Sequence, residues 1–217
     1  MARRTPTIAA ALAVSAALLL TACGGSSNDA SKDKIKGADE GTKSASPNPS
    51  GAGTGQPDLS LPKDVKLDIN WSGTSDPEQK AALQGVSNYL RAFKHGLVKQ
   101  DPDDPAYKAY AVGPAAEYTR TQIKQWVAGG WTPTGTDRFY KSQTNESSST
   151  KAVVVTFCRN QSQAYGKNVK TGKVYRTKES PDSYQLYRMY MKPSKASSDT
   201  WQAQTIEVFG KAKQCQQ

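Results

Sequence analysis

The sequence predicts an α+β fold for residues 61–217, with N-terminal helices packed on one face of an antiparallel sheet. Between residues 83 and 127, apolar side chains recur every three or four positions, which is the spacing of helices with one buried side. After Trp131, apolar and polar side chains alternate, which is typical of strands with one buried face. Helices followed by a run of strands indicate the α+β class, whereas regular alternation of the two indicates a parallel α/β sheet.

Residues 75–78, with the sequence Ser-Asp-Pro-Glu, predict the start of a long helix. The serine hydroxyl can cap the first turn, proline fits the first position, and glutamate three residues after serine completes a capping box. The apolar stripe that follows predicts a helix ending near Val98. Its members are Leu83, Val86, Leu90, Phe93 and Leu97.

Two shorter helices are expected after a turn at residues 101–105, where Asp and Pro gather. The first covers residues 106–111. The second begins at Gly113-Pro114, since proline is favoured in a first turn, and stops at the glycine pair 129–130. The side chains of this helix that should face the core are Tyr118, Ile123, Trp126 and Val127.

Four strands are predicted in the second half of the domain. They cover residues 138–144, 152–158, 184–192 and 201–209. The segment Lys170-Thr171-Gly172-Lys173 has the composition of a hairpin tip between the second strand and the third.

Residues 1–22 have the layout of a secretory signal peptide. Arg3 and Arg4 give a basic start, and small residues precede Cys23. The apolar segment, residues 8–20, is shorter than the roughly 20 residues that a membrane-spanning helix needs. We therefore expect export rather than a transmembrane anchor.

The segment Leu20-Thr21-Ala22-Cys23 resembles the bacterial lipobox. In that family the cysteine thiol receives a diacylglycerol and the signal peptidase cuts before it, which implies that Cys23 is the acylated mature N-terminus. Two acyl chains anchor a protein stably, whereas one anchors it marginally. The resemblance thus implies a protein on the cell membrane, facing the extracytoplasmic side, with the lipid bilayer as partner. The alternative is ordinary secretion with Cys23 unmodified.

Residues 23–60 form a lipidated cysteine and a flexible tether in this interpretation. Gly, Ser, Thr, Pro and charged residues dominate them, so the segment cannot bury enough apolar surface to offset its ordering entropy. The chain then divides into a signal peptide at 1–22, the tether at 23–60 and one domain at 61–217. Its formal net charge is +10. Export argues against nucleic acid, so this charge favours anionic lipids or wall polymers, or a solvated surface without a partner.

Cys158 and Cys215 are the two cysteines of the predicted domain. Two thiols in an exported domain predict one disulfide. The bridge would tie the polar C-terminal tail to the end of the valine-rich strand. Metal ligation needs more ligands than these cysteines and the single histidine provide, so no metal site is expected.

The order of helices and strands is similar to the cone-shaped fold of nuclear transport factor 2 and its relatives, which has a strongly curved sheet. Residues 75–210 also resemble a group of small actinobacterial lipoproteins. The resembling pieces are residues 126–133, the cysteine that ends a valine-rich strand, residues 164–167 and Gln214-Cys215. Fold analogy alone does not license a function.

The resemblance to the cone fold implies two kinds of chemistry. Relatives include isomerases and dehydratases that bind an apolar ligand and use a carboxylate or a His–Asp pair as base. Asp137 is the weak catalytic candidate here, with Tyr140 and Tyr187 as hydrogen-bonding neighbours. We favour the alternative in which Asp137 belongs to a turn and the tyrosines fill the core. His95 lies off the apolar stripe, so we expect it to face solvent.

Aromatic side chains either line a pocket or fill the core of the domain. The candidates for pocket walls are Tyr89, Trp126, Tyr140 and Tyr187. No cofactor is expected, because the glycine pairs lack the strand-to-helix context of a phosphate loop.

These observations lead to two functional hypotheses. The first is a non-enzymatic lipoprotein that presents a cone-shaped module to a small molecule or to an envelope protein. A partner in envelope assembly is attractive, since some penicillin-binding proteins carry such a module as a non-catalytic domain. The second is an isomerase- or dehydratase-like enzyme that uses Asp137.

Overall fold

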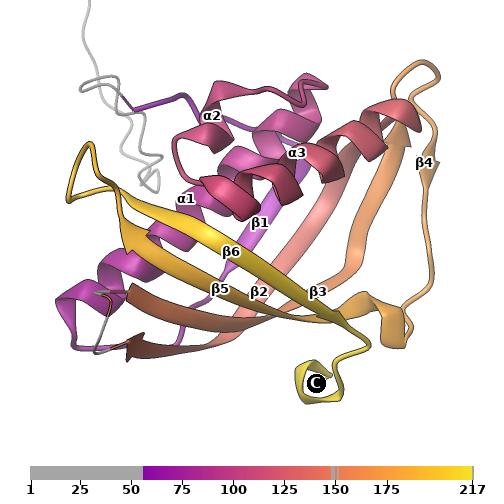
Figure 1. Ribbon diagram of the computed structural model, residues 1–217. Helices are drawn as coiled ribbons and strands as arrows, with labels where there is room; N and C mark the ends of the chain where they lie inside the picture. The colour runs from indigo at the N-terminus through magenta and orange to yellow at the C-terminus, as the bar shows by residue number, and fades with distance from the viewer. Residues whose placement is uncertain (1–55, 148–149, 151, 217) are drawn as a thin grey trace, which may run out of the picture. The chain divides into compact units, whose positions relative to one another are not determined.

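The computed structural model describes residues 56–147, 150 and 152–216 (Figure 1). All of them belong to one compact unit, residues 51–217. The expected signal peptide, the lipidation site Cys23 and the tether up to residue 55 lie outside the described residues. None of the described helices is both long and apolar enough to span a membrane.

The described strands form one mixed sheet with the order β1-β2-β3-β5-β6, and β4 pairs with β3. They are β1 (Val65–Ile69), β2 (Trp131–Ser147), β3 (Ala152–Asn168), β4 (Val174–Tyr175), β5 (Tyr184–Pro193) and β6 (Trp201–Gly210). The α+β class is confirmed. The sheet is mixed rather than purely antiparallel, because β1, which is absent from the predicted strands, runs parallel to β2.

The sheet bends strongly along its long strands (Figure 1). Pairing between β2 and β3 shifts register between Thr136 and Arg138 and again between Tyr140 and Gln143. Such bulges bend and twist the strand that contains them. Both strands also extend beyond their predicted bounds, since backbone pairing continues through the polar residues 159–168, where apolar alternation has ended.

The helices are α1 (Pro77–Lys99), α2 (Pro105–Lys108) and α3 (Gly113–Ala128). Asp76 caps α1, and its carboxylate accepts a hydrogen bond from the backbone N–H of Gln79 at 2.9 Å. The predicted serine cap is therefore wrong by one residue. Asp104 caps α2 in the same way, through the backbone N–H of Ala106, and this helix is shorter than predicted.

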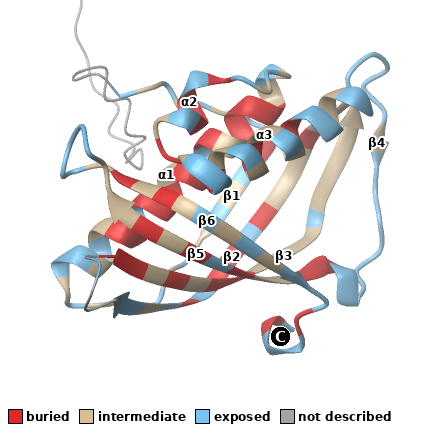
Figure 2. Ribbon diagram, in the orientation of Figure 1, coloured by how far each residue is buried: buried red, intermediate tan, exposed pale blue. Residues whose placement is uncertain are grey.

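All three helices lie on one side of the sheet, which we call the inner face (Figures 1 and 2). Its core contains most of the predicted stripe of α1 together with Ile123, Val155 and Phe157, each fully or almost fully buried. Gly85 allows α1 to approach β6 closely, because a Cβ atom there would lie 2.6 Å from Cβ of Trp201. The main core therefore sits between the helices and the inner face.

The opposite side of the sheet, which we call the outer face, carries a second and smaller buried cluster. It comprises Tyr140, Cys158, Tyr184, Ala212 and Cys215, with Leu186 packed against it. The sulfurs of Cys158 and Cys215 are 2.05 Å apart, so the predicted pairing is present. The C-terminal tail, with its 3-10 turn η2 (Lys213–Cys215), is thereby held against the outer face.

Residues 170–173 form the tip of the hairpin between β3 and β4, as predicted. The side-chain oxygen of Asn168 accepts hydrogen bonds from the backbone N–H groups of Lys170 and Thr171 at 3.1 and 2.9 Å. After β4, an extended segment leads to the 3-10 turn η1 (Pro181–Ser183) and into β5. This segment forms one side of the site described next.

Candidate functional site: a cavity beside a buried ion cluster

A cavity of about 450 Å³ lies where the distal half of β3 faces α1, α3 and the segment after β4. Trp126 of α3, Tyr165 of β3 and Tyr175 of β4 are the aromatic residues of its lining. Lys94 and Arg159 line it from α1 and β3. The cavity thus combines apolar ring surface with two cationic side chains.

The cations belong to a buried ion cluster that is centred on Asp137 of β2. Nε of Arg159 lies 2.6 Å from Oδ1 of Asp137, and the ammonium group of Lys94 forms an ion pair with Oδ2. The side chains of Asp137, Lys94 and Arg159 are 1%, 8% and 15% exposed. Each carboxylate oxygen therefore faces one cation in a region largely closed to water.

The positions of the three residues follow from the elements that carry them. Lys94 is four residues after Leu90 and three before Leu97, so it lies on the buried side of α1. Arg159 continues the alternation of Val155 and Phe157 and points to the inner face. Asp137 follows the same rule on β2, two residues before the buried Phe139. Three charged side chains thus occupy positions where apolar residues are expected.

The guanidinium group of Arg159 is also held on its other side. Its Nη1 donates to the side-chain oxygen of Gln185 at 3.1 Å and lies 3.5 Å from the hydroxyl of Tyr187. Tyr118 lies near Tyr187 and Arg159. Burial raises the pKa of the Tyr118 hydroxyl well above its ordinary value, so the Tyr118 hydroxyl stays neutral. The surroundings orient Arg159 without adding a second negative charge.

The cluster changes the acid–base properties of Asp137. Burial raises the pKa of this carboxyl, but the charges of Arg159 and Lys94 outweigh burial and bring the pKa down to about 2. Burial lowers the pKa of Lys94, and Asp137 opposes that effect. A carboxylate with so low a pKa holds a proton weakly, which makes it a poor general base near neutral pH.

The structure separates the residues that the sequence suggested for one site. Trp126 lines the cavity. Tyr89 is buried in the main core, and its hydroxyl bonds that of Thr119 at 2.8 Å. Tyr187 stacks on Phe157. Tyr140 lies on the outer face, where its hydroxyl donates to the carbonyl of Cys215.

Asp137 and His95 also differ from their expected settings. Asp137 lies within β2 rather than in a turn, and its partners are cations rather than Tyr140. The expectation that His95 faces solvent is wrong, because its residue exposure is 8%. Its Nδ1 lies 2.6 Å from Oδ2 of Asp104, the cap of α2, so the pair joins α1 to the next helix.

Sequence reasoning missed Lys94 and Arg159, although both carry a detectable signal. Lys94 falls on the helical period of the apolar stripe, and Arg159 falls on the inner parity of its strand. No group of three or more His, Cys, Asp or Glu side chains able to hold a metal ion occurs among the described residues.

The comparisons with known proteins find distant likenesses only. No family model and no curated protein matches the chain. Eight solved chains match. The intermembrane space region of chloroplast protein ARC6 is 10% identical, covers 64% of this chain and 99% of its own, and has a TM-score of 0.39. The protein Aln2 from a Streptomyces species is 11% identical, with coverages of 64% and 94% and a TM-score of 0.42.

A nuclear transport factor 2-like superfamily protein from Salmonella enterica is 13% identical, with coverages of 63% and 92% and a TM-score of 0.40. These proteins are similar to the chain in the general arrangement of helices on a curved sheet. At such scores the likeness carries no argument about ligand or activity. The fold class rests on the elements and the strand pairing described above.

Proposed function

We propose that the protein is an extracytoplasmic lipoprotein, anchored through an acylated Cys23, whose domain binds a small ligand and catalyses no reaction. The ligand site is the cavity between β3, the helices and the segment after β4. The observation that carries the proposal is the pairing of Asp137 with both Lys94 and Arg159 beside that cavity. This pairing provides fixed charge beside the cavity and makes the carboxylate of Asp137 too weak a base for proton abstraction.

The cavity lining offers little else that could act as a base. Asp182 is the one carboxylate among the described lining residues, and its side chain is 73% exposed and 3.5 Å from the ammonium of Lys211. His95 is bonded to Asp104 and is not part of the lining. An isomerase or dehydratase of the kind considered from the sequence needs a base in contact with the ligand. The binding module therefore explains the site better.

Filling the cavity tests the ligand site. Ala164 lines the cavity on β3, whereas its neighbour Gln163 is exposed. We expect Ala164→Trp to weaken binding of the probe 2-naphthoate at least tenfold, while Gln163→Trp leaves it unchanged. Isothermal titration calorimetry on the full chain in a non-ionic detergent, with a detergent blank subtracted, measures both. No binding of an aromatic probe to the unaltered chain, or equal effects of the two variants, contradicts the proposed site.

The anchor is tested separately. Cys23→Ala should move the protein from the membrane fraction to the soluble one, or stall its processing, because the acylated thiol is lost. Detergent extraction of the membrane fraction measures the partition, and Cys215→Ser serves as the matched control. Unchanged partition of Cys23→Ala contradicts lipid anchoring.

A further inference from the structure

We infer that the ligand of this cavity is a small organic monoanion, a carboxylate on a planar apolar body, with Lys94 and Arg159 as its binding partners. This inference rests on the proposed binding function and names the chemical class of the ligand. Three observations carry it: the charge of the ion cluster, the free donors of its cations, and the aromatic lining.

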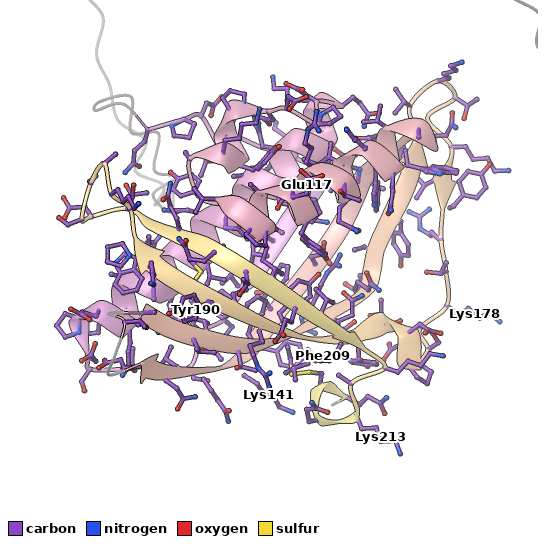
Figure 3. All side chains as sticks on the ribbon, viewed as in Figure 1. Glu117, Lys141, Lys178, Tyr190, Phe209 and Lys213 are labelled. Carbon is purple, nitrogen blue, oxygen red and sulfur yellow. A yellow bond between two sulfur atoms is a disulfide. The ribbon has the colours of Figure 1, made fainter. Side chains whose placement is uncertain are left out.

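The charge of the cluster does not balance. Lys94 and Arg159 each contribute one positive charge and Asp137 contributes one negative charge, which leaves an excess of one positive charge. All three side chains are at least 85% buried, so water compensates this excess poorly. The other charged side chains of the lining, Lys178 and Asp182, are exposed, so water and salt screen them (Lys178 is labelled in Figure 3). One bound negative charge makes the buried cluster neutral.

The cations retain donors for such a charge. Within the described part of the chain, Asp137 is the one ion-pair or hydrogen-bond partner of the Lys94 ammonium, which has three N–H donors. The guanidinium of Arg159 bonds Asp137, Gln185 and Tyr187 through Nε and Nη1, which leaves Nη2 without a partner there. Both side chains line the cavity. A carboxylate fits a lysine and arginine pair through charge-assisted hydrogen bonds.

The excess of a single charge favours a carboxylate over a phosphate monoester. A phosphate monoester carries about −1.5 to −2 charges at neutral pH, which exceeds the unbalanced charge of the cluster. The remaining lining includes the aromatic residues Trp126, Tyr165 and Tyr175. Aromatic side chains pack favourably on flat apolar groups. The ligand class that satisfies both parts of the cavity is therefore a planar apolar carboxylate.

Matched probes test the inference on the full chain in the same detergent. The two probes, 2-naphthoate and 2-naphthamide, have nearly the same shape and differ by one negative charge. We expect naphthoate to bind at least tenfold more tightly, because the cluster compensates its charge. 2-Naphthyl phosphate should bind more weakly than naphthoate. Equal affinities for naphthoate and naphthamide, or tighter binding of the phosphate, overturn the inference.

Variants of the cations locate the effect. Lys94→Met nearly keeps the length of the side chain and removes the excess charge, so naphthoate should bind about tenfold more weakly, with a clearly smaller loss for naphthamide. Lys99→Met, an exposed position on the same helix, should change neither affinity. Equal losses of naphthoate affinity in Lys94→Met and Lys99→Met also overturn the inference. If Lys94→Met does not fold, the three probes on the unaltered chain still decide.

The failure of this inference differs from the failure of the proposed function. If naphthamide binds as tightly as naphthoate and Ala164→Trp blocks both, the cavity is a ligand site without preference for anions. If neither probe binds, the proposed binding function itself is wrong.

Discussion

The two faces of the sheet are stabilised by different means. On the inner face, helices cover an apolar core into which one carboxylate and two cations are built. On the outer face, a small cluster is closed by a disulfide and a short polar tail. The inner face buries charge, which costs desolvation free energy, whereas the outer face gains stability from a covalent link. The contrast fits the proposed ligand site, which lies on the side where charge is buried.

The largest effect is expected from Asp137→Asn. The substitution leaves Lys94 and Arg159 buried without a counter-charge, and breaking a buried ion pair in this way costs about 3–5 kcal/mol of unfolding free energy. Denaturant titration of the full chain followed by circular dichroism measures the loss. The matched control is Asp68→Asn, since the carboxylate of Asp68 pairs with Arg138 at 3.2 Å on the surface.

The control variant Asp68→Asn should lose less than about 1 kcal/mol, because exposed ion pairs contribute little. Similar losses in the two variants would show that the buried cluster is not a special feature of the inner face.

The disulfide should have the next largest effect. Cys215→Ser removes the link between the tail and β3, and loss of a native disulfide in a small exported domain costs about 2–5 kcal/mol. Intact-mass measurement with and without reductant checks that the bridge exists in the unaltered protein, since reduction adds about two mass units per bridge. Thermal melting of Cys215→Ser then gives the loss. Two free thiols in the protein isolated without reductant would refute the pairing.

The sequence predicts the two faces unequally well. Alternation of Val153, Val155 and Phe157 places Cys158 on the other side of the strand, so the outer disulfide follows from parity and cysteine count. Tyr140 and Tyr187, two of the pocket candidates, do not meet because side chains on one strand alternate between the faces. Tyr140 follows the inner-facing Phe139 and therefore lies on the outer face, whereas Tyr187 lies on the inner face.

The ion cluster is harder to predict, because its partners come from α1, β2 and β3. A charged residue on an apolar period looks like an irregularity until its partner is known. Strand β1 is missed for a similar reason: its partner β2 begins more than 60 residues later, and parallel pairing has no local turn to announce it. Local spacing places a residue on one face but does not identify a partner on a distant element; the disulfide is the exception, because the predicted domain has two cysteines.

Acid should lower the free energy of unfolding through the ion cluster of the inner face, whereas the disulfide of the outer face does not titrate. The pKa of Asp137 is about 2 in the folded protein, compared with 3.8 for an unperturbed carboxyl. A lowered pKa stabilises the fold fully above the unfolded value and loses that contribution as pH falls through the folded value. We therefore expect a loss of about 2 kcal/mol between about pH 4 and pH 2.

Asp103 titrates in the same range and must be separated from this effect. Hydrogen bonds from Arg120 and Lys108 hold the pKa of its exposed carboxyl at about 2. Unfolding free energies of Asp103→Asn at pH 5 and pH 2 supply the test. If the acid loss disappears in Asp103→Asn, the contribution of Asp137 is refuted.

The smallest change in unfolding free energy is expected for an exposed ion pair on the strands that, like Arg159 and Asp137, joins an arginine to a carboxylate. Arg188 of β5 and Glu207 of β6 are direct neighbours in register, and Nη1 lies 3.3 Å from Oε2. Both side chains are more than half exposed, so water and salt screen the pair. Glu207→Gln should change the unfolding free energy by less than about 1 kcal/mol, and the difference should vanish in about 1 M salt. The effect of Asp137→Asn should change less with salt, because the Asp137 side chain is 1% exposed and its pairing with Lys94 and Arg159 is screened less than an exposed pair. Equal salt sensitivity of Asp137→Asn and Glu207→Gln would contradict the contrast between buried and exposed charge.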